Sequence, residues 1–189
     1  MTEPPDPRPA ARQWAGMLGA LDDDDPVRPT PCTDDTVGDL VDHVDKGCRG
    51  LVTVAGAPLI GPDDTAEPAA AHVRGDPRQD LAHYAVALAA AWSDPRARTG
   101  SSPVAPGVDL PNAIRGRIAP AELDVHGCDL ARANGRPFAL PDDVLRDSLD
   151  RLLAFVPTAP VAGLGSEPVA VPPGTPLLDR VVAAAGRRT

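Results

Sequence analysis

The chain has 189 residues and a mass of 19.5 kDa, which is enough for one domain with its own hydrophobic core and too little for two full ones. Its formal net charge is −9, and Lys46 is its only lysine. Because Lys and Arg do not cluster with interleaved aromatic residues, the composition argues against a phosphate-binding surface and predicts no nucleic-acid partner.

The sequence contains no segment typical of membrane insertion or secretion. No apolar run reaches the roughly eighteen residues of a membrane span, and residues 1–6 lack the basic flank and apolar core of a signal peptide. Three cysteines without C-x-x-C spacing, Cys32, Cys48 and Cys128, fit a reducing compartment rather than a disulfide framework or a cysteine-rich zinc site. We therefore expect a cytoplasmic protein with no membrane partner, and N and O ligands for any metal.

Apolar residues at helical spacing predict the first two helices. Residues 1–9 are rich in proline and predict a flexible leader, and the spacing that follows predicts a helix over residues 12–21. Thr36 is the expected N-cap of a second helix that runs to about residue 55. Residues 56–76 are rich in Pro, Gly, Asp and Ala without periodicity and predict a loop.

The second half of the chain predicts three further helices, over residues 77–93, 118–134 and 141–157. The segment before the second of these predicts a loop with a short extended piece near residues 104–110. A Pro- and Gly-rich tail then contains one amphipathic turn at residues 177–182, which we expect to dock on the helices.

Together these elements predict an all-α fold with long loops. Residues 10–157 form an antiparallel helical bundle that includes an additional helix, the one ending at Pro157. Residues 158–189 form a short C-terminal extension on that bundle.

The predicted helix over residues 118–134 carries polar side chains on the face that should be apolar. At about 100° per residue, Glu122, His126 and Asp129 fall on one inward stripe, whereas Asp124 and Cys128 face away. Burying an unpaired carboxylate costs several kcal/mol. Glu122 and His126 therefore need a partner, which is a shared proton, a cation or a metal.

His43 lies at the edge of the apolar stripe of the second helix. One imidazole from that helix together with Glu122 and His126 gives three N and O ligands and an open position, the pattern of a catalytic metal site. Zinc is the default ion for this set, which also accepts nickel, iron or manganese. Two alternatives stay open: His43 as an edge histidine bonded to a neighbour, and Glu122 with His126 as a buried pair that shares a proton.

Three further residues have two interpretations each. Asp129 either accepts a hydrogen bond that orients the His126 imidazole or bonds across helices. Arg115 and Arg117, just ahead of the predicted helix over residues 118–134, either bind an anionic substrate carboxylate or balance nearby acids. Cys128 is expected to pack rather than to bind an ion.

Three stretches resemble the DinB-like metal-binding superfamily, in particular the actinobacterial branch related to the metal-binding domain of mycothiol-dependent maleylpyruvate isomerase. They are residues 29–43 (Pro-Thr-Pro-Cys, then Val-Gly-Asp-Leu-Val-Asp-His), residues 121–135 (beginning Ala-Glu-Leu-Asp-Val-His-Gly-Cys-Asp-Leu) and residues 176–187. They follow the family's order and span nearly the whole chain.

The resemblance implies a four-helix DinB bundle with a divalent ion, usually zinc or nickel. The family binds this ion through a histidine of the second helix and through an acid or histidine and a histidine four residues apart on the fourth, which correspond to His43, Glu122 and His126. Related enzymes use the ion to bind a low-molecular-weight thiol such as mycothiol or bacillithiol. A divalent cation stabilises thiolate over thiol and so makes the sulfur nucleophilic.

The chain departs from the family at the expected pocket. The family commonly has a tryptophan after Pro-Cys and another after His-Gly, where this chain has residues 33–36 and Cys128. The isomerase also has a sizeable carboxy-terminal domain, which residues 158–189 are too few to replace. Isomerisation of maleylpyruvate is therefore not the expected reaction.

Two functions from different classes follow. The first, favoured by the resemblance, is a metal-dependent enzyme of transferase or isomerase type that activates a mycothiol-like thiol or water toward an electrophilic small molecule, in detoxification or specialised metabolism. The second is a non-catalytic or metal-free DinB-type ligand-binding domain, with Glu122 and His126 as an acid/base pair if it is catalytic. The partner is a small molecule in both, and the oligomeric state stays open, a homodimer included.

Overall fold

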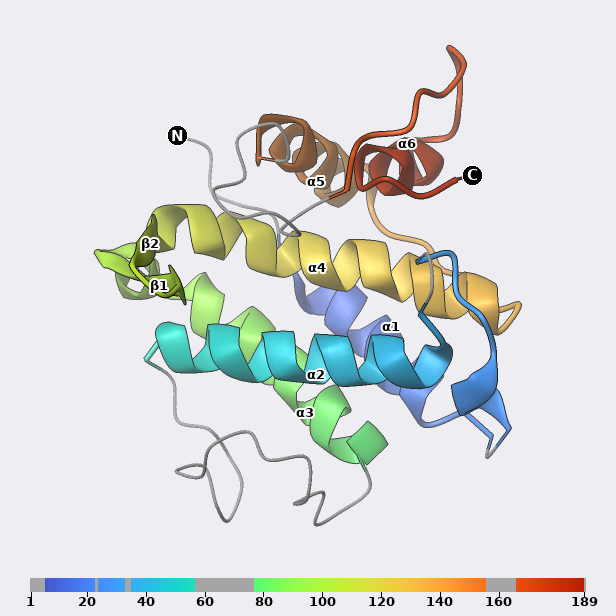
Figure 1. Cartoon of the computed structure of the whole chain (residues 1–189), viewed down its shortest axis with the longest axis horizontal. Helices are drawn as coiled ribbons and strands as arrows, with labels where there is room; N and C mark the ends of the chain where they lie inside the picture. Colours follow the sequence, from blue (N-terminus) through green and yellow to red (C-terminus); the bar gives the residue numbers. More distant parts are fainter. Residues whose placement is uncertain (1–5, 23, 33–34, 57–76, 156–165, 189) are drawn as a thin grey trace.

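A computed structural model describes residues 6–22, 24–32, 35–56, 77–155 and 166–188 of the chain (Figure 1). The start of the expected leader, nearly all of the expected loop over residues 56–76, and residues 156–165 lie outside this description. So do residues 33 and 34, part of the first departure from the family pattern.

The described part of the chain is mostly helical, which confirms the all-α fold class. The N-cap predicted at Thr36 is also confirmed, since its hydroxyl accepts from the backbone N–H of Asp39 and the Asp39 carboxylate accepts from that of Thr36. In chain order the elements are α1 (Arg8–Leu18), η1 (Asp25–Val27), α2 (Val37–Val54), α3 (Pro77–Ser93), η2 (Pro95–Arg98), β1 (Ser101–Ala105), β2 (Val108–Pro111), α4 (Asn112–Ala133), α5 (Asp142–Phe155) and α6 (Leu177–Ala184).

Helix α4 lies at the centre of the molecule (Figure 1). It contacts α1, α2 and α3 on one side and α5 and α6 on the other, and α5 and α6 also contact each other. Nearly every residue of α4 from Ala119 to Ala131 is buried in consequence. A helix enclosed in this way has no solvent-facing stripe, so periodicity alone does not describe it.

This enclosure corrects the prediction that Asp124 and Cys128 face away from the buried side. Asp124 is 0% exposed and Cys128 is 2% exposed, because the expected single stripe ignored α5 and α6. Cys128 packs, as expected. Asp124 accepts a hydrogen bond from the Ser148 hydroxyl of α5, and its second oxygen has no partner among the described residues.

A close approach fixes α4 against its neighbours at Gly127. A Cβ atom there would lie 2.6 Å from the Phe138 ring and 3.0 Å from Nε1 of Trp14, so a side chain would overlap both. The Trp14 indole is fully buried and donates to the Leu123 carbonyl at 2.8 Å. Close contact of α1 with the middle of α4 therefore requires glycine at residue 127, because any side chain there would overlap Trp14 and Phe138.

The predicted bounds of two helices were wrong, and the predicted extended piece is part of a hairpin. Helix α1 spans Arg8–Leu18 rather than residues 12–21, because the prolines at its start fit a first helical turn. Helix α4 begins at Asn112, six residues before the predicted start, and continues through Pro120, since tertiary packing overrides local propensity. The extended piece near residues 104–110 is the hairpin of β1 and β2, which turns at Gly107 with a φ of 75°.

The buried Asp124 carboxyl predicts a pH-dependent stability. Burial raises its pKa to about 7, against the opposing effects of the Ser148 hydrogen bond and the Arg151 charge. A pKa raised on folding means that this group costs nothing below about pH 4 and destabilises the fold increasingly as the pH rises to about 7. We expect Asp124→Asn to raise the free energy of unfolding by roughly 1–3 kcal/mol at pH 8 and by much less at pH 4.5, as measured by urea denaturation.

The matched control is Asp150→Asn, an exposed aspartate of the same partner helix α5, which should change neither value appreciably. An equal gain for Asp124→Asn at both pH values would contradict the assignment.

Candidate metal centre

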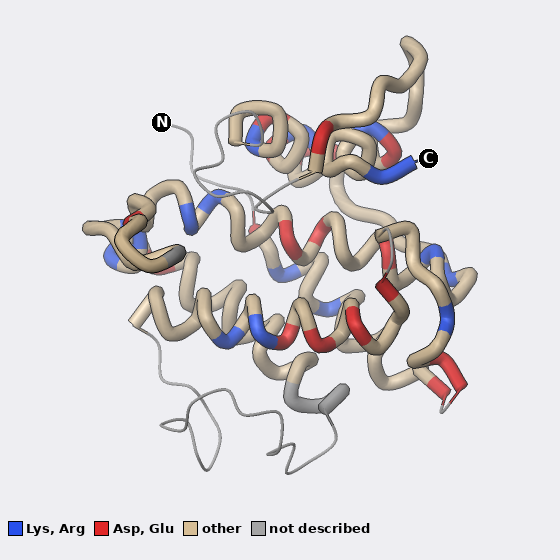
Figure 2. The backbone as a smooth tube through the Cα atoms, viewed as in Figure 1, with Lys and Arg blue, Asp and Glu red and all other residues tan. Residues whose placement is uncertain are grey.

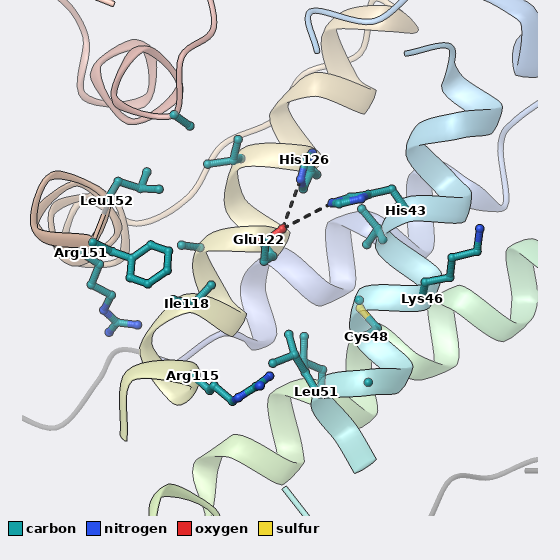
Figure 3. Close-up of a pocket in the computed structure, with 18 of the residues that line it drawn as sticks. His43, Lys46, Cys48, Leu51, Arg115, Ile118, Glu122, His126, Arg151 and Leu152 are labelled. Atoms are coloured by element: carbon teal, nitrogen blue, oxygen red, sulfur yellow. Dashed lines mark ion pairs between the residues drawn. The ribbon is translucent and has the colours of Figure 1, made fainter. Parts of the chain in front are cut away.

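Helices α2 and α4 bring three potential ligands together. His43 projects from α2, and Glu122 and His126 project from adjacent turns of α4 toward it (Figure 3). Nε2 of His126 lies 3.2 Å from Oε2 of Glu122, and Nε2 of His43 lies 3.8 Å from the same oxygen. The two imidazole rings have centroids 4.9 Å apart. The three residues expected from the sequence therefore converge.

The donor set fits a small divalent ion. One ligand atom from each of the three residues can be chosen so that all lie within 4.8 Å of one another. Ligands that bind a tetrahedral ion at about 2.1 Å are separated by about 3.4 Å, so small side-chain adjustments would complete the geometry. We call His43, Glu122 and His126 the ligand trio.

The trio is exposed at one end and buried at the other. The His43 side chain is 60% exposed and that of Glu122 40% exposed, whereas that of His126 is 9% exposed. The access to the trio is therefore on the α2 side, beside His43.

A buried carboxylate orients the inner imidazole. Asp129 is fully buried, and its Oδ2 lies 3.3 Å from Nδ1 of His126. An imidazole that donates from Nδ1 to this carboxylate presents its Nε2 lone pair to an ion, an arrangement common at metal-binding histidines. The same oxygen also accepts from Nε of Arg187 at 3.1 Å.

Arg187 is a site residue that the sequence analysis missed. It follows α6, and its guanidinium contacts Asp129, lies 3.4 Å from Nδ1 of His126, and lies 3.5 Å from the Cys32 sulfur. The segment over residues 176–187 carried part of the family resemblance, but helical periodicity cannot tell which side chain of a docked segment reaches across to another helix.

The neighbours of the trio set its protonation. Burial would raise the pKa of Glu122, but hydrogen bonds to His126 and His43 outweigh it and hold that pKa well below its usual range. Burial would lower the pKa of His126, but its bonds to Asp129 and Glu122 raise it to about 9. Without an ion, the trio therefore holds a carboxylate and an imidazolium, and an ion that binds His126 must displace a proton from it.

The trio lies at the edge of a cavity of about 550 Å³. This volume suits a small molecule. Arg115 lines the cavity, whereas Arg117 is exposed and is not among the lining residues. The sequence analysis also missed Arg151 of α5 as a lining residue. The apolar part of the wall includes Leu51, Leu88, Leu110, Ile118, Val125 and Leu152.

A family model described as mycothiol maleylpyruvate isomerase N-terminal domain matches residues 8–131. The chain belongs to this family. It is a DinB-like family of metal-binding domains, which confirms the resemblance to the DinB-like superfamily and to the maleylpyruvate isomerase domain. Searches of curated proteins and of solved structures found no match.

The matched residues contain the whole ligand trio and Asp129. Helices α5 and α6, and with them Arg187, lie beyond the match. None of the helices in the described ranges combines the length and the apolar character needed to span a membrane.

The contacts of Arg187 predict that it supports both the fold and the ligand trio. Arg187→Ala leaves the Asp129 carboxylate buried without its arginine partner, which should lower the free energy of unfolding by about 3 kcal/mol. It should also weaken zinc binding by about tenfold or more, because the His126 ring loses part of its support. Urea denaturation and competition with a chromogenic chelator measure the two effects.

Arg188→Ala is the matched control, because the next arginine along the chain is exposed. Equal effects of the two substitutions would show that the Arg187 contacts support neither property.

Proposed function

We propose that the chain is a small metal-dependent enzyme of transferase or isomerase type. In this proposal, His43, Glu122 and His126 hold a divalent ion, zinc first and nickel second, that activates a low-molecular-weight thiol or water toward an electrophilic small molecule. Its role is detoxification or specialised metabolism. The observation that carries the proposal is the convergence of the trio at the edge of a small-molecule cavity. The family description names mycothiol, which makes it the first thiol to test.

The members of the trio and the neighbouring Asp129 have distinct roles in this proposal. Asp129 orients the His126 ring so that Nε2 faces the ion. Glu122 supplies the one negative charge of the trio, which leaves a bound divalent ion with net positive charge. Exposed His43 keeps the outer side accessible to an incoming ligand. The ion supplies Lewis acidity, which favours thiolate over thiol at neutral pH.

The cavity wall supports the same chemistry. Its apolar side chains offer fewer polar groups to water beside the trio than an open surface would, and electrostatic interactions are stronger where less water is present. A thiolate held there is less solvated than in bulk water and is shielded from competing reactions with the solvent.

A second candidate function is a metal-free ligand-binding or acid/base site. One observation favours it: Glu122 and Asp129 supply two carboxylates, and Arg187 with protonated His126 supplies two cations in direct contact with them. The four charges balance without an ion. In this alternative, Glu122 and His126 exchange a proton with a bound ligand.

Metal analysis separates the two candidates. The purified protein, after dialysis against zinc, should retain about one equivalent of zinc by elemental analysis. His43→Ala and His126→Ala should reduce this to a small fraction, because each removes one of three ligands. His83→Ala, an exposed histidine on α3, is the matched control and should retain the ion. Retention by all three variants would exclude the trio as the site.

The thiol dependence is tested with a reporter electrophile. The zinc-loaded protein should accelerate the reaction of mycothiol with 1-chloro-2,4-dinitrobenzene, followed by its absorbance, and His126→Ala should abolish that acceleration. Free cysteine serves as the comparison thiol. A rate that is the same with and without zinc would favour the metal-free candidate.

A further inference from the structure

One face of α4 carries a cation at one end of the cavity and a metal ligand further along. Arg115, Ile118 and Glu122 all line the cavity, and seven residues separate the first from the last. Seven residues are close to two helical turns, so the two side chains share a face and their Cα atoms are roughly 10 Å apart. A single elongated molecule can therefore contact both.

Arg115 is held in place without a carboxylate partner. Its Nη2 donates to the carbonyls of Ser102 and Pro103 in β1. In the part of the chain that the structure describes, Asp109 influences Arg115 electrostatically but no acid forms an ion pair with it, and its buried Nε has no acceptor there. Figure 3 shows its guanidinium pointing away from α4 in the direction of Leu51 of α2. A partly buried cation of this kind favours an anionic ligand.

The surroundings of Arg115 strengthen that preference. Arg115 lies in the first turn of α4, where no acidic residue offsets the positive end of the helix dipole. Figure 2 shows basic residues, both arginines, near the start of α4 and acidic residues only further along it. Burial lowers the pKa of Arg115 while Asp109 raises it, and a guanidinium keeps its charge in either case.

The other cavity cations are less suited to bind a ligand. Arg151 pairs with Asp147 and donates to the Arg117 carbonyl, so its guanidinium is already engaged. Lys46 is exposed at the rim. Between Arg115 and the trio the wall includes Ile118 of α4 and Leu51 of α2, which offer no side-chain hydrogen bond.

We propose that Arg115 binds a carboxylate of the ligand, so that the cavity selects small carboxylic acids with an apolar middle and a reacting group at the far end, next to the ligand trio. The reacting end of this inference rests on the proposed function, whereas the carboxylate end depends on Arg115 alone. Because Nη2 donates to the two β1 carbonyls and Nε is buried, Nη1 is the nitrogen left to donate to the carboxylate, and the guanidinium charge strengthens that hydrogen bond.

The first test uses thiols that differ only at the far end. The full chain loaded with Co²⁺ is titrated with 6-mercaptohexanoate and with 6-mercapto-1-hexanol, and thiolate binding is followed by the sulfur-to-cobalt charge-transfer absorption. We expect the acid to bind about tenfold more tightly than the alcohol, the effect of one charge-assisted contact. Arg115→Gln should reduce the ratio to about one.

Arg117→Gln is the matched control, two residues further along α4 and outside the cavity wall, and it should keep the tenfold ratio. If Arg115→Gln folds poorly, Arg115→Lys takes its place as the test variant. It retains the charge and a donor for the β1 carbonyls, and it should keep part of the preference for the acid. Equal affinity for acid and alcohol in the unmodified protein, or a preference that survives Arg115→Gln, would overturn the proposal.

A second measurement needs no metal and so separates this inference from the proposed function. Hexanoate should raise the melting temperature of the metal-free chain more than 1-hexanol does, in the unmodified protein and in Arg117→Gln, and this difference should disappear in Arg115→Gln. If the protein binds no ion but shows this pattern, the proposed metal chemistry fails and the carboxylate site stands. Equal responses to the two compounds overturn the carboxylate site whether or not an ion binds.

Discussion

The buried carboxylate of Asp129 connects the ligand trio to the rest of the fold. It contacts the His126 imidazole on its own helix and the Arg187 guanidinium from the end of the chain. A fully buried carboxylate is tolerated only when such partners offset its desolvation. The position of the His126 imidazole and the docking of the segment after α6 against α4 are therefore parts of one electrostatic arrangement, and Arg187 itself lines the cavity.

The ligand trio was predictable because it depends on local rules. The N-cap at Thr36 sets the phase of α2 and hence the place of His43 at the edge of its buried face. Spacing of four residues puts Glu122 and His126 on adjacent turns of one helix, whatever surrounds it. What the sequence could not establish alone is that α2 and α4 lie side by side (Figure 1), and there the family resemblance supplied the arrangement.

The errors have a common cause in tertiary packing. The sequence analysis assigned α4 one buried stripe, and the structure buries it on several sides, which misplaced Asp124. Arg151 reaches the cavity from α5 and Arg187 from the segment after α6, and no periodicity predicts which side chains of these C-terminal elements point inward. The sequence analysis gave Arg115 and Arg117 the same two interpretations. Only the orientation of the start of α4 in the structure shows that Arg115 lines the cavity and Arg117 does not.

The position of Arg187 outside the matched residues has a consequence for the family as a whole. The part of the chain that defines membership supplies the ligand trio and Asp129, but the arginine that contacts Asp129 behind the inner imidazole comes from a segment that the family model does not cover. In a protein that combined this matched domain with a different terminal segment, the three candidate ligands would stay the same and the group that contacts Asp129 would change. Reactivity within such a family can then diverge through exchange of the terminal segment, with no substitution at the ligands themselves.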